Sequence, residues 1–197
     1  MTLDVRWATT GDRAAILDTI ARAFFADPLW SWVFPDADER RAHSPALWDF
    51  FLTAGLRYGS VEIAGASAAA AIWTPPGLPP IDDDESIALE AFFRDRLGAR
   101  VEPVLEGLGR IDAVHPEEPH WYLGVVSTHP AHAGHGIGVA LLAHHLGTVD
   151  AEHLPAYLES SNPANLERYE RLGFVPRQEI AVAADGPVVT TMWRPAR

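Results

Sequence analysis

The chain has 197 residues, of which 48% are hydrophobic, so it is long and apolar enough to form one globular domain with a buried core. Its formal net charge of −12 argues against general nucleic-acid binding, because that binding depends on basic side chains that neutralise phosphates. The absence of cysteine excludes disulfides and thiolate metal sites. Neither a signal-peptide pattern nor a membrane-length apolar run is visible, so we expect a cytoplasmic protein with no membrane partner, monomeric or homodimeric.

The N-terminal half alternates strand and helix patterns. A short strand is predicted at "LDVRWA", a helix after Thr10, a second helix over Glu39–Tyr58, and two strands joined at Gly65. Residues 27–36, "DPLWSWVFPD", are predicted to form an aromatic loop because two prolines interrupt the pattern. One or two helices are predicted from Ser86 to Val114, within a stretch 75–116 that we expect to close a pocket.

The C-terminal half has clearer boundaries. Strands are predicted at "HWYLGVVST" and "PAYLESS", helices over Gly138–Asp150 and Ala164–Leu172, and a closing antiparallel pair around Asp185–Gly186. The order indicates a single mixed α/β domain over 1–197.

Three alternating glycines lie between a predicted strand and a predicted helix: Gly134, Gly136 and Gly138 in "AHAGHGIG". At such a place free backbone N–H groups and the helix dipole favour an anion, and bare positions let a phosphate approach closely. A tight turn that needs glycine only for its geometry is the alternative. The Gly-Lys-Ser/Thr of a P-loop is missing. The spacing to Glu159 is compatible with a dinucleotide fingerprint, but the loop's place in the C-terminal half argues against one.

Together with "YLESSNPANLERYERLGF", this loop resembles the GNAT superfamily of N-acetyltransferases, and in particular its puromycin N-acetyltransferase-like members. "EPHWYLGVVSTHPAHAGHGIG" and "AAAAIWTPP" carry the same resemblance. The resemblance implies a GNAT fold: a mixed, mostly antiparallel sheet of about six or seven strands flanked by helices. It also implies an acceptor-side half, about 1–117, and an acetyl-CoA-binding half, about 118–197. One position departs from the family pattern, since Ala133 stands where Gln or Arg is usual.

The resemblance further implies roles for individual residues. Tyr169 corresponds to the family tyrosine near the thioester sulfur, and a phenol can act as the general acid toward a departing thiolate. Without the resemblance, an aromatic packed on the core is the favoured interpretation of Tyr169. Asn162 is expected to cap the following helix or form its turn. The residues expected to bind acetyl-CoA are Val126, Ser127, Thr128, Ala133, Gly134, His135, Gly136, Ile137, Gly138, Val139 and Asn165.

Two candidates for the general base lie on predicted strands. Glu159 is a carboxylate among small and apolar residues, where it serves as a base, pairs with an arginine or faces solvent. His120 is the second candidate, with a surface histidine as the alternative. By the two-residue period His120, Tyr122, Val126 and Thr128 should share one strand face.

The acceptor pocket must come from the N-terminal half. An aromatic cage with a carboxylate would suit a cationic amine, although the same aromatics could instead fill the core. The candidates are Phe24, Asp27, Trp30, Trp32 and Trp73. No metal site is expected at His129, His132 and His135, which lack a nearby carboxylate, and His144–His145 is interpreted as an exposed pair.

The resemblance implies an acetyl-CoA-dependent N-acetyltransferase. The acetyl group would pass directly, in a ternary complex, to the primary amine of a small molecule such as an aminonucleoside or another antibiotic. The alternatives are a protein or peptide N-acetyltransferase of the same fold and a non-catalytic acyl-CoA-binding sensor.

Overall fold

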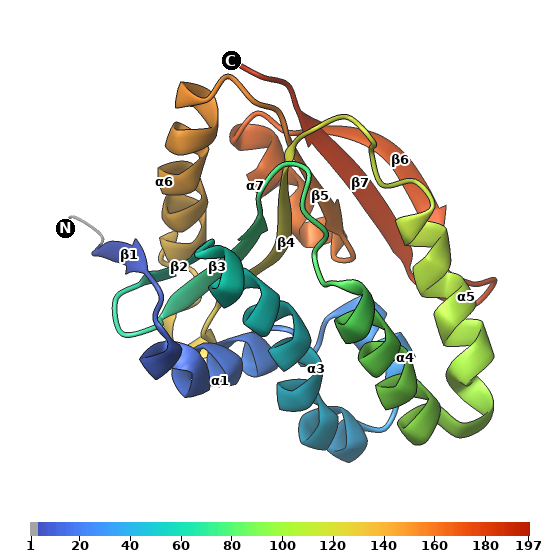
Figure 1. Ribbon diagram of the computed structural model, residues 1–197. Helices are drawn as coiled ribbons and strands as arrows, with labels where there is room; N and C mark the ends of the chain where they lie inside the picture. The colour runs from blue at the N-terminus through green and yellow to red at the C-terminus, as the bar shows by residue number, and fades with distance from the viewer. Residues whose placement is uncertain (1–3) are drawn as a thin grey trace.

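The computed structural model describes residues 4–197, so Leu3, at the start of the first predicted strand, lies outside the described residues. One sheet of seven strands has the order β1-β2-β3-β4-β5-β7-β6 (Figure 1). All neighbouring strands are antiparallel except β4 and β5, which confirms the predicted mixed, mostly antiparallel sheet. The strands are β1 (Val5–Trp7), β2 (Val61–Ala64), β3 (Ala69–Thr74), β4 (Trp121–Thr128), β5 (Ala156–Ser160), β6 (Val175–Ala181) and β7 (Val188–Arg194).

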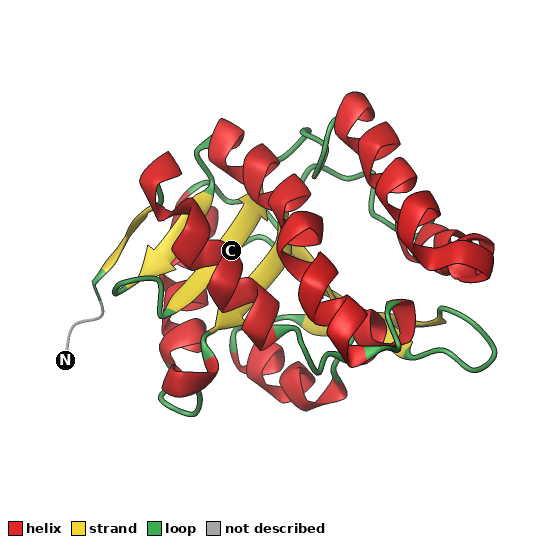
Figure 2. Ribbon diagram, turned by 90° about the horizontal axis from the view of Figure 1, so that it is seen from below, coloured by secondary structure: helices red, strands yellow, loops and turns green. Residues whose placement is uncertain are grey.

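Helices cover both faces of the sheet (Figure 2). They are α1 (Arg13–Ala23), α2 (Pro28–Val33), α3 (Ala37–Tyr58), α4 (Asp83–Leu97), α5 (Val101–Asp112), α6 (Ile137–Ala151) and α7 (Leu166–Arg171). Apolar side chains of α6 and α7 pack on one face, whereas α1 and α3 pack on the other. A third apolar cluster joins α2, α3, α4 and α5 to the β6–β7 end of the sheet. In residues 4–197 the helices lack the combination of length and apolar character that a membrane span needs.

Helix α2 corrects the prediction of a loop over residues 27–36. Asp27 precedes the helix, and its carboxylate accepts hydrogen bonds from the backbone N–H groups of Leu29, at 3.0 Å, and Trp30. Pro28 occupies the first helical position, where its missing N–H and fixed φ are favourable. The proline therefore starts this helix and does not interrupt one.

A β-bulge at Gly124 corrects a second prediction. Ile72 lies opposite Val125 and Trp73 opposite Leu123, so Gly124 is an extra residue in β4. The bulge reverses the alternation of side chains along the strand. Leu123 and Val126 consequently both pack toward α6, while Val125 packs toward α1 and α3. His120 and Tyr122 therefore do not share a face with Val126.

The parallel pairing of β4 with β5 is short. Only Trp121–Leu123 pair with Ala156–Leu158, although β4 runs on to Thr128 and β5 to Ser160. Beyond Leu123 the two strands share no ladder, and we call this unpaired stretch the β4–β5 seam. The seam lies beside the loop that begins α6.

Candidate functional site

The three glycines before α6 are required for two different reasons. Gly134 and Gly136 have φ of +80° and +73°, in the left-handed region that favours glycine, and Gly136 is the N-cap of α6. Gly138 is helical, but a Cβ there would lie 2.7 Å from Oγ1 of Thr128, at the end of β4. The loop is thus a turn that also brings its backbone close to the strand before it. Both interpretations from the sequence, the turn and the cradle, fit this geometry.

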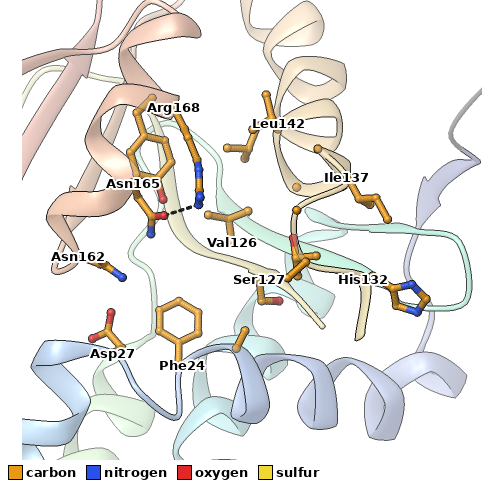
Figure 3. Close-up of a pocket in the computed structure, with 18 of the residues that line it drawn as sticks. Phe24, Asp27, Val126, Ser127, His132, Ile137, Leu142, Asn162, Asn165 and Arg168 are labelled. Atoms are coloured by element: carbon orange, nitrogen blue, oxygen red, sulfur yellow. Dashed lines mark hydrogen bonds between the residues drawn. The ribbon is translucent and has the colours of Figure 1, made fainter. Parts of the chain in front are cut away.

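A cavity of about 530 Å³ adjoins this loop (Figure 3). Its walls come from α1 and the α1–α2 connection, the end of β4, the glycine loop with the start of α6, and α7 with the turn before it. It brings together most of the residues singled out from the sequence: Phe24, Asp27, Val126, Ser127, Thr128, Ala133, Gly134, Gly136, Ile137, Gly138, Val139, Asn165 and Tyr169. His135, Glu159, Trp30 and Trp73 do not line it, and in the described chain no lining residue comes from the 75–116 stretch.

Positive charge at the cavity comes from two arginines that the sequence reasoning missed. Arg168 and Arg171 of α7 both line the cavity, and Arg168 donates a 2.7 Å hydrogen bond to Oδ1 of Asn165 (Figure 3). Helical spacing could have found Arg168, since it lies three residues after Asn165 and therefore on the same face. His132, Asn162, Leu142 and Leu172 also line the cavity, and Asn162 caps the turn before α7, as predicted.

Tyr169 faces the cavity from α7 and is 9% exposed. Its ring packs edge-on against Phe174, at 6.2 Å between ring centroids. Burial raises the pKa of its phenol to about 12, and the nearby charge of Asp27 acts in the same direction. The hydroxyl is therefore protonated at neutral pH and able to donate a hydrogen bond into the cavity.

Asp27 is a buried carboxylate in the same cavity (Figure 3). One oxygen caps α2, and the other accepts a 2.6 Å hydrogen bond from Oγ of Ser161, just after β5. Burial raises the pKa of the carboxyl group, and these hydrogen bonds oppose that shift. The contact with Ser161 ties the acceptor-side half of the chain to the C-terminal half.

Glu159 lies outside the cavity, in a second polar cluster on the opposite face of the sheet from α6. Its Oε2 accepts a 2.7 Å hydrogen bond from the hydroxyl of Tyr122, and its Oε1 lies 3.5 Å from Nδ1 of His115. The ring of His115 meets those of Tyr122 and Tyr157 edge-on, each at 4.9 Å. The hydroxyl of Tyr157 is buried and has no hydrogen-bond partner. Burial raises the pKa of both tyrosines.

His120 belongs to this cluster and is buried, which corrects its interpretation as a surface histidine. Its Nδ1 lies 2.6 Å from the carbonyl oxygen of Glu118. Burial lowers the pKa of the imidazole. Sequence reasoning missed His115 altogether, because it lies in the loop before β4 and carries no periodic signal.

Two aromatic predictions need correction. Trp73 is fully buried and stacks on His145, at 4.4 Å and 19°, so it belongs to the core under α6 and not to an acceptor pocket. His145 is likewise fully buried, and only His144 of the expected exposed pair is exposed.

Trp30 packs on Trp48, at 5.0 Å, and the ring of Trp32 lies under Arg100. Across residues 4–197 no group of three or more His, Asp and Glu side chains is arranged to hold a metal ion.

Comparison with known proteins gives consistent matches. The model of the acetyltransferase (GNAT) family matches residues 62–174. An uncharacterised N-acetyltransferase of Schizosaccharomyces pombe is 28% identical, over 87% of this chain and 74% of its own. A crystal structure described as histone acetyltransferase HPA2 and related acetyltransferase, from Corynebacterium glutamicum, is 29% identical with a TM-score of 0.73, covering 100% and 98% of the two chains. Arylalkylamine N-acetyltransferase 2 of Aedes aegypti shares the fold, with a TM-score of 0.69 at 12% identity over the whole of both chains.

Proposed function

Since the chain belongs to the GNAT family of acetyltransferases, we propose that it acetylates the primary amine of a small molecule in a ternary complex with acetyl-CoA. It is an N-acetyltransferase, and acetyl-CoA is its co-substrate. One observation carries the proposal: the glycine loop, the open end of β4 and the buried phenol of Tyr169 all line a single cavity. A phosphate cradle, a channel for an extended arm and a proton donor are thereby in one place.

The pyrophosphate of acetyl-CoA fits the loop from Ala133 to Val139. Backbone N–H groups at the start of α6 face the cavity there, and the glycines leave the approach clear. Ala133 supplies no cationic side chain, but Arg168 brings positive charge to the same cavity, and Arg171, which is paired with Glu167, lines it too. Val126, Ser127 and Thr128 offer main-chain groups along the β4–β5 seam for the pantetheine arm, and Asn165 lies beside them.

The proposed acid and base lie on opposite faces of the sheet. Tyr169 belongs to the cluster under α6, whereas Glu159 belongs to the cluster with Tyr122 and His115. A thioester held in the seam between β4 and β5 would have the acid on one side and the incoming amine on the other. We propose that Tyr169 is the general acid for the leaving thiolate, acting through a hydrogen bond to the sulfur, and that Glu159 accepts the proton of the amine, directly or through water. His120 is the less suitable base, because it is buried and its Nδ1 is engaged by the carbonyl of Glu118.

The proposed acceptor is a cationic amine next to Phe24 and Asp27. The buried carboxylate of Asp27 and the ring of Phe24 share the cavity wall, and Trp30 follows on α2. Together with the resemblance to puromycin N-acetyltransferases, these residues make an aminonucleoside or another antibiotic a specific acceptor to test. A peptide amine is the second candidate, because the 75–116 stretch does not close the cavity.

A panel of amines tests the proposal through release of CoA by the purified protein. Puromycin, tryptamine, agmatine and spermidine represent small acceptors, and a peptide with a free N-terminus represents the alternative. We expect the highest kcat/KM for one of the small amines. Faster turnover of the peptide than of every small amine would replace the proposed acceptor class, and acetyl-CoA binding without CoA release from any amine would favour a sensor.

The role of Glu159 is tested with Glu159→Gln, which keeps its shape and removes the base. We expect kcat for the best amine to fall about 10²- to 10⁴-fold. Glu179→Gln on β6 is the matched control, because Glu179 is exposed on the edge strand, two strands from β5. A kcat for Glu159→Gln equal to that of the control would remove Glu159 as the base.

A further inference from the structure

Tyr169 and Glu159 alone do not account for every proton in the proposed reaction. An ammonium acceptor loses two protons when it becomes an amide, and the departing thiolate takes up one of them. One proton must therefore leave the site in every turnover. If Glu159 accepts it, the carboxylic acid must pass it on before the next amine binds, yet the side chain of Glu159 is only 11% exposed.

His115 lies between Glu159 and solvent, where it can carry this proton away. Tyr122 occupies Oε2 of Glu159, which leaves Oε1 facing Nδ1 of His115 at 3.5 Å. A small side-chain movement or one water closes that distance to a hydrogen bond. The side chain of His115 is 28% exposed, so the same ring that faces the buried carboxyl group also reaches solvent.

We propose that His115 is a proton-relay residue that takes the amine's proton from Glu159 and releases it to water. The inference rests on the proposed role of Glu159 as the base. In the step, the O–H bond of the Glu159 carboxylic acid breaks and an N–H bond forms at Nδ1 of His115. The imidazolium then loses a proton to water, and both side chains return to their starting charge with no redox change.

The neighbouring groups are poorer relays. Burial raises the pKa of the Tyr122 and Tyr157 phenols, so neither releases a proton readily near neutral pH. His120 is buried, and its Nδ1 is engaged by the carbonyl of Glu118. The titratable and charged groups around His115 come from α5, the following loop, β4, β5 and β6: Asp112, Glu118, His120, Tyr122, Tyr157, Glu159 and Arg177.

Chemical rescue tests the relay. His115→Ala opens a space beside Glu159 that free imidazole can enter, and His115→Gln keeps a polar side chain that cannot carry a proton. With the best amine of the panel, we expect kcat to fall about tenfold or more in both variants. Imidazole in the buffer should restore kcat of His115→Ala, but not of His115→Gln. His153→Asn is the control, because His153 is exposed and its φ of +52° suits Asn.

Three readouts separate a relay from a structural role. The pH profile of kcat should change in both variants, while acetyl-CoA affinity and Tm stay at the wild-type values. If His115→Ala turns over at the wild-type rate, or loses turnover without imidazole rescue and with an unchanged pH profile, the relay is wrong. If Glu159→Gln itself retains full turnover, the proposed base has failed and the relay falls with it. A loss in Glu159→Gln alone refutes only the relay.

Discussion

Substitution of Tyr169 by Phe removes one hydroxyl from the cavity and keeps the ring. The ring is 9% exposed and packs against Phe174, so its contribution to folding should survive. The hydroxyl is the group proposed to serve the departing thiolate. Any loss in turnover therefore reports on that contact, provided that Tm and acetyl-CoA affinity are unchanged.

The raised pKa of Tyr169 sets the size of the expected loss. A phenol with a pKa of about 12 is a much weaker acid than an ordinary thiol near 8.5, so complete transfer of its proton to a thiolate is uphill. We therefore expect Tyr169 to act as a hydrogen-bond donor to the sulfur as charge develops there. Such a bond to a charged acceptor contributes about 1.5–3 kcal/mol, which corresponds to a roughly 10- to 150-fold fall in kcat.

Single-turnover CoA release, with chemistry shown to limit the rate, measures this loss. Because the pKa of Tyr169 is about 12, its ionisation should not reduce kcat below about pH 11. Any fall in kcat at lower alkaline pH must then persist in Tyr169→Phe. Turnover within about twofold of wild type would show that Tyr169 is only a packed aromatic, and a rise in acceptor KM alone would point to positioning of the amine.

Three further substitutions test the cavity. Gly136→Glu should abolish acetyl-CoA binding measured by calorimetry. It places a negative side chain in the proposed cradle and strains a backbone at φ +73°. Unchanged affinity in the folded variant would refute the cradle. Gly138→Ala should weaken acetyl-CoA binding, because its Cβ would lie 2.7 Å from Oγ1 of Thr128. Adding Thr128→Ala should restore part of the affinity. Equal losses with and without Thr128 would show that this contact is not the cause. Asp27 has a raised folded-state pKa, so its contribution to stability is complete below the unfolded value near 3.9 and is lost as pH rises through the folded value. In urea unfolding, Asp27→Asn should therefore gain stability relative to wild type between pH 4 and pH 7, and a difference that does not change with pH would refute this assignment.

The sequence predicted the C-terminal half well, because its signals are local. Strand patterns, the glycine loop and the Asp185–Gly186 turn each depend on adjacent residues, and β4, α6, β5, β6 and β7 follow them closely. Local reasoning also misread one segment, since prolines at 28 and 35 mark the edges of a short helix as readily as a loop.

What the sequence could not predict depends on partners distant along the chain. The bulge at Gly124 exists only in register with Ile72 and Trp73, and it decides which face Tyr122 and Val126 take. In the same way, the burial of Trp73 follows from its stacking on His145, 72 residues later in the chain. The apolar strand around Glu159 drew attention to this carboxylate, but its neighbour His115 could be found only in three dimensions.

The short ladder between β4 and β5 gives the sheet two free edges in its interior. Edges of this kind at the rim of a sheet recruit other strands and are a cause of aggregation. Here the β4 edge, at Val126–Thr128, lines the cavity between α1, the start of α6 and α7. A slender extended molecule that carries amide groups could pair with it, and the pantetheine arm of acetyl-CoA is one. Its binding would complete the ladder in the manner of strand addition, with recognition resting on backbone groups that no side-chain substitution can remove.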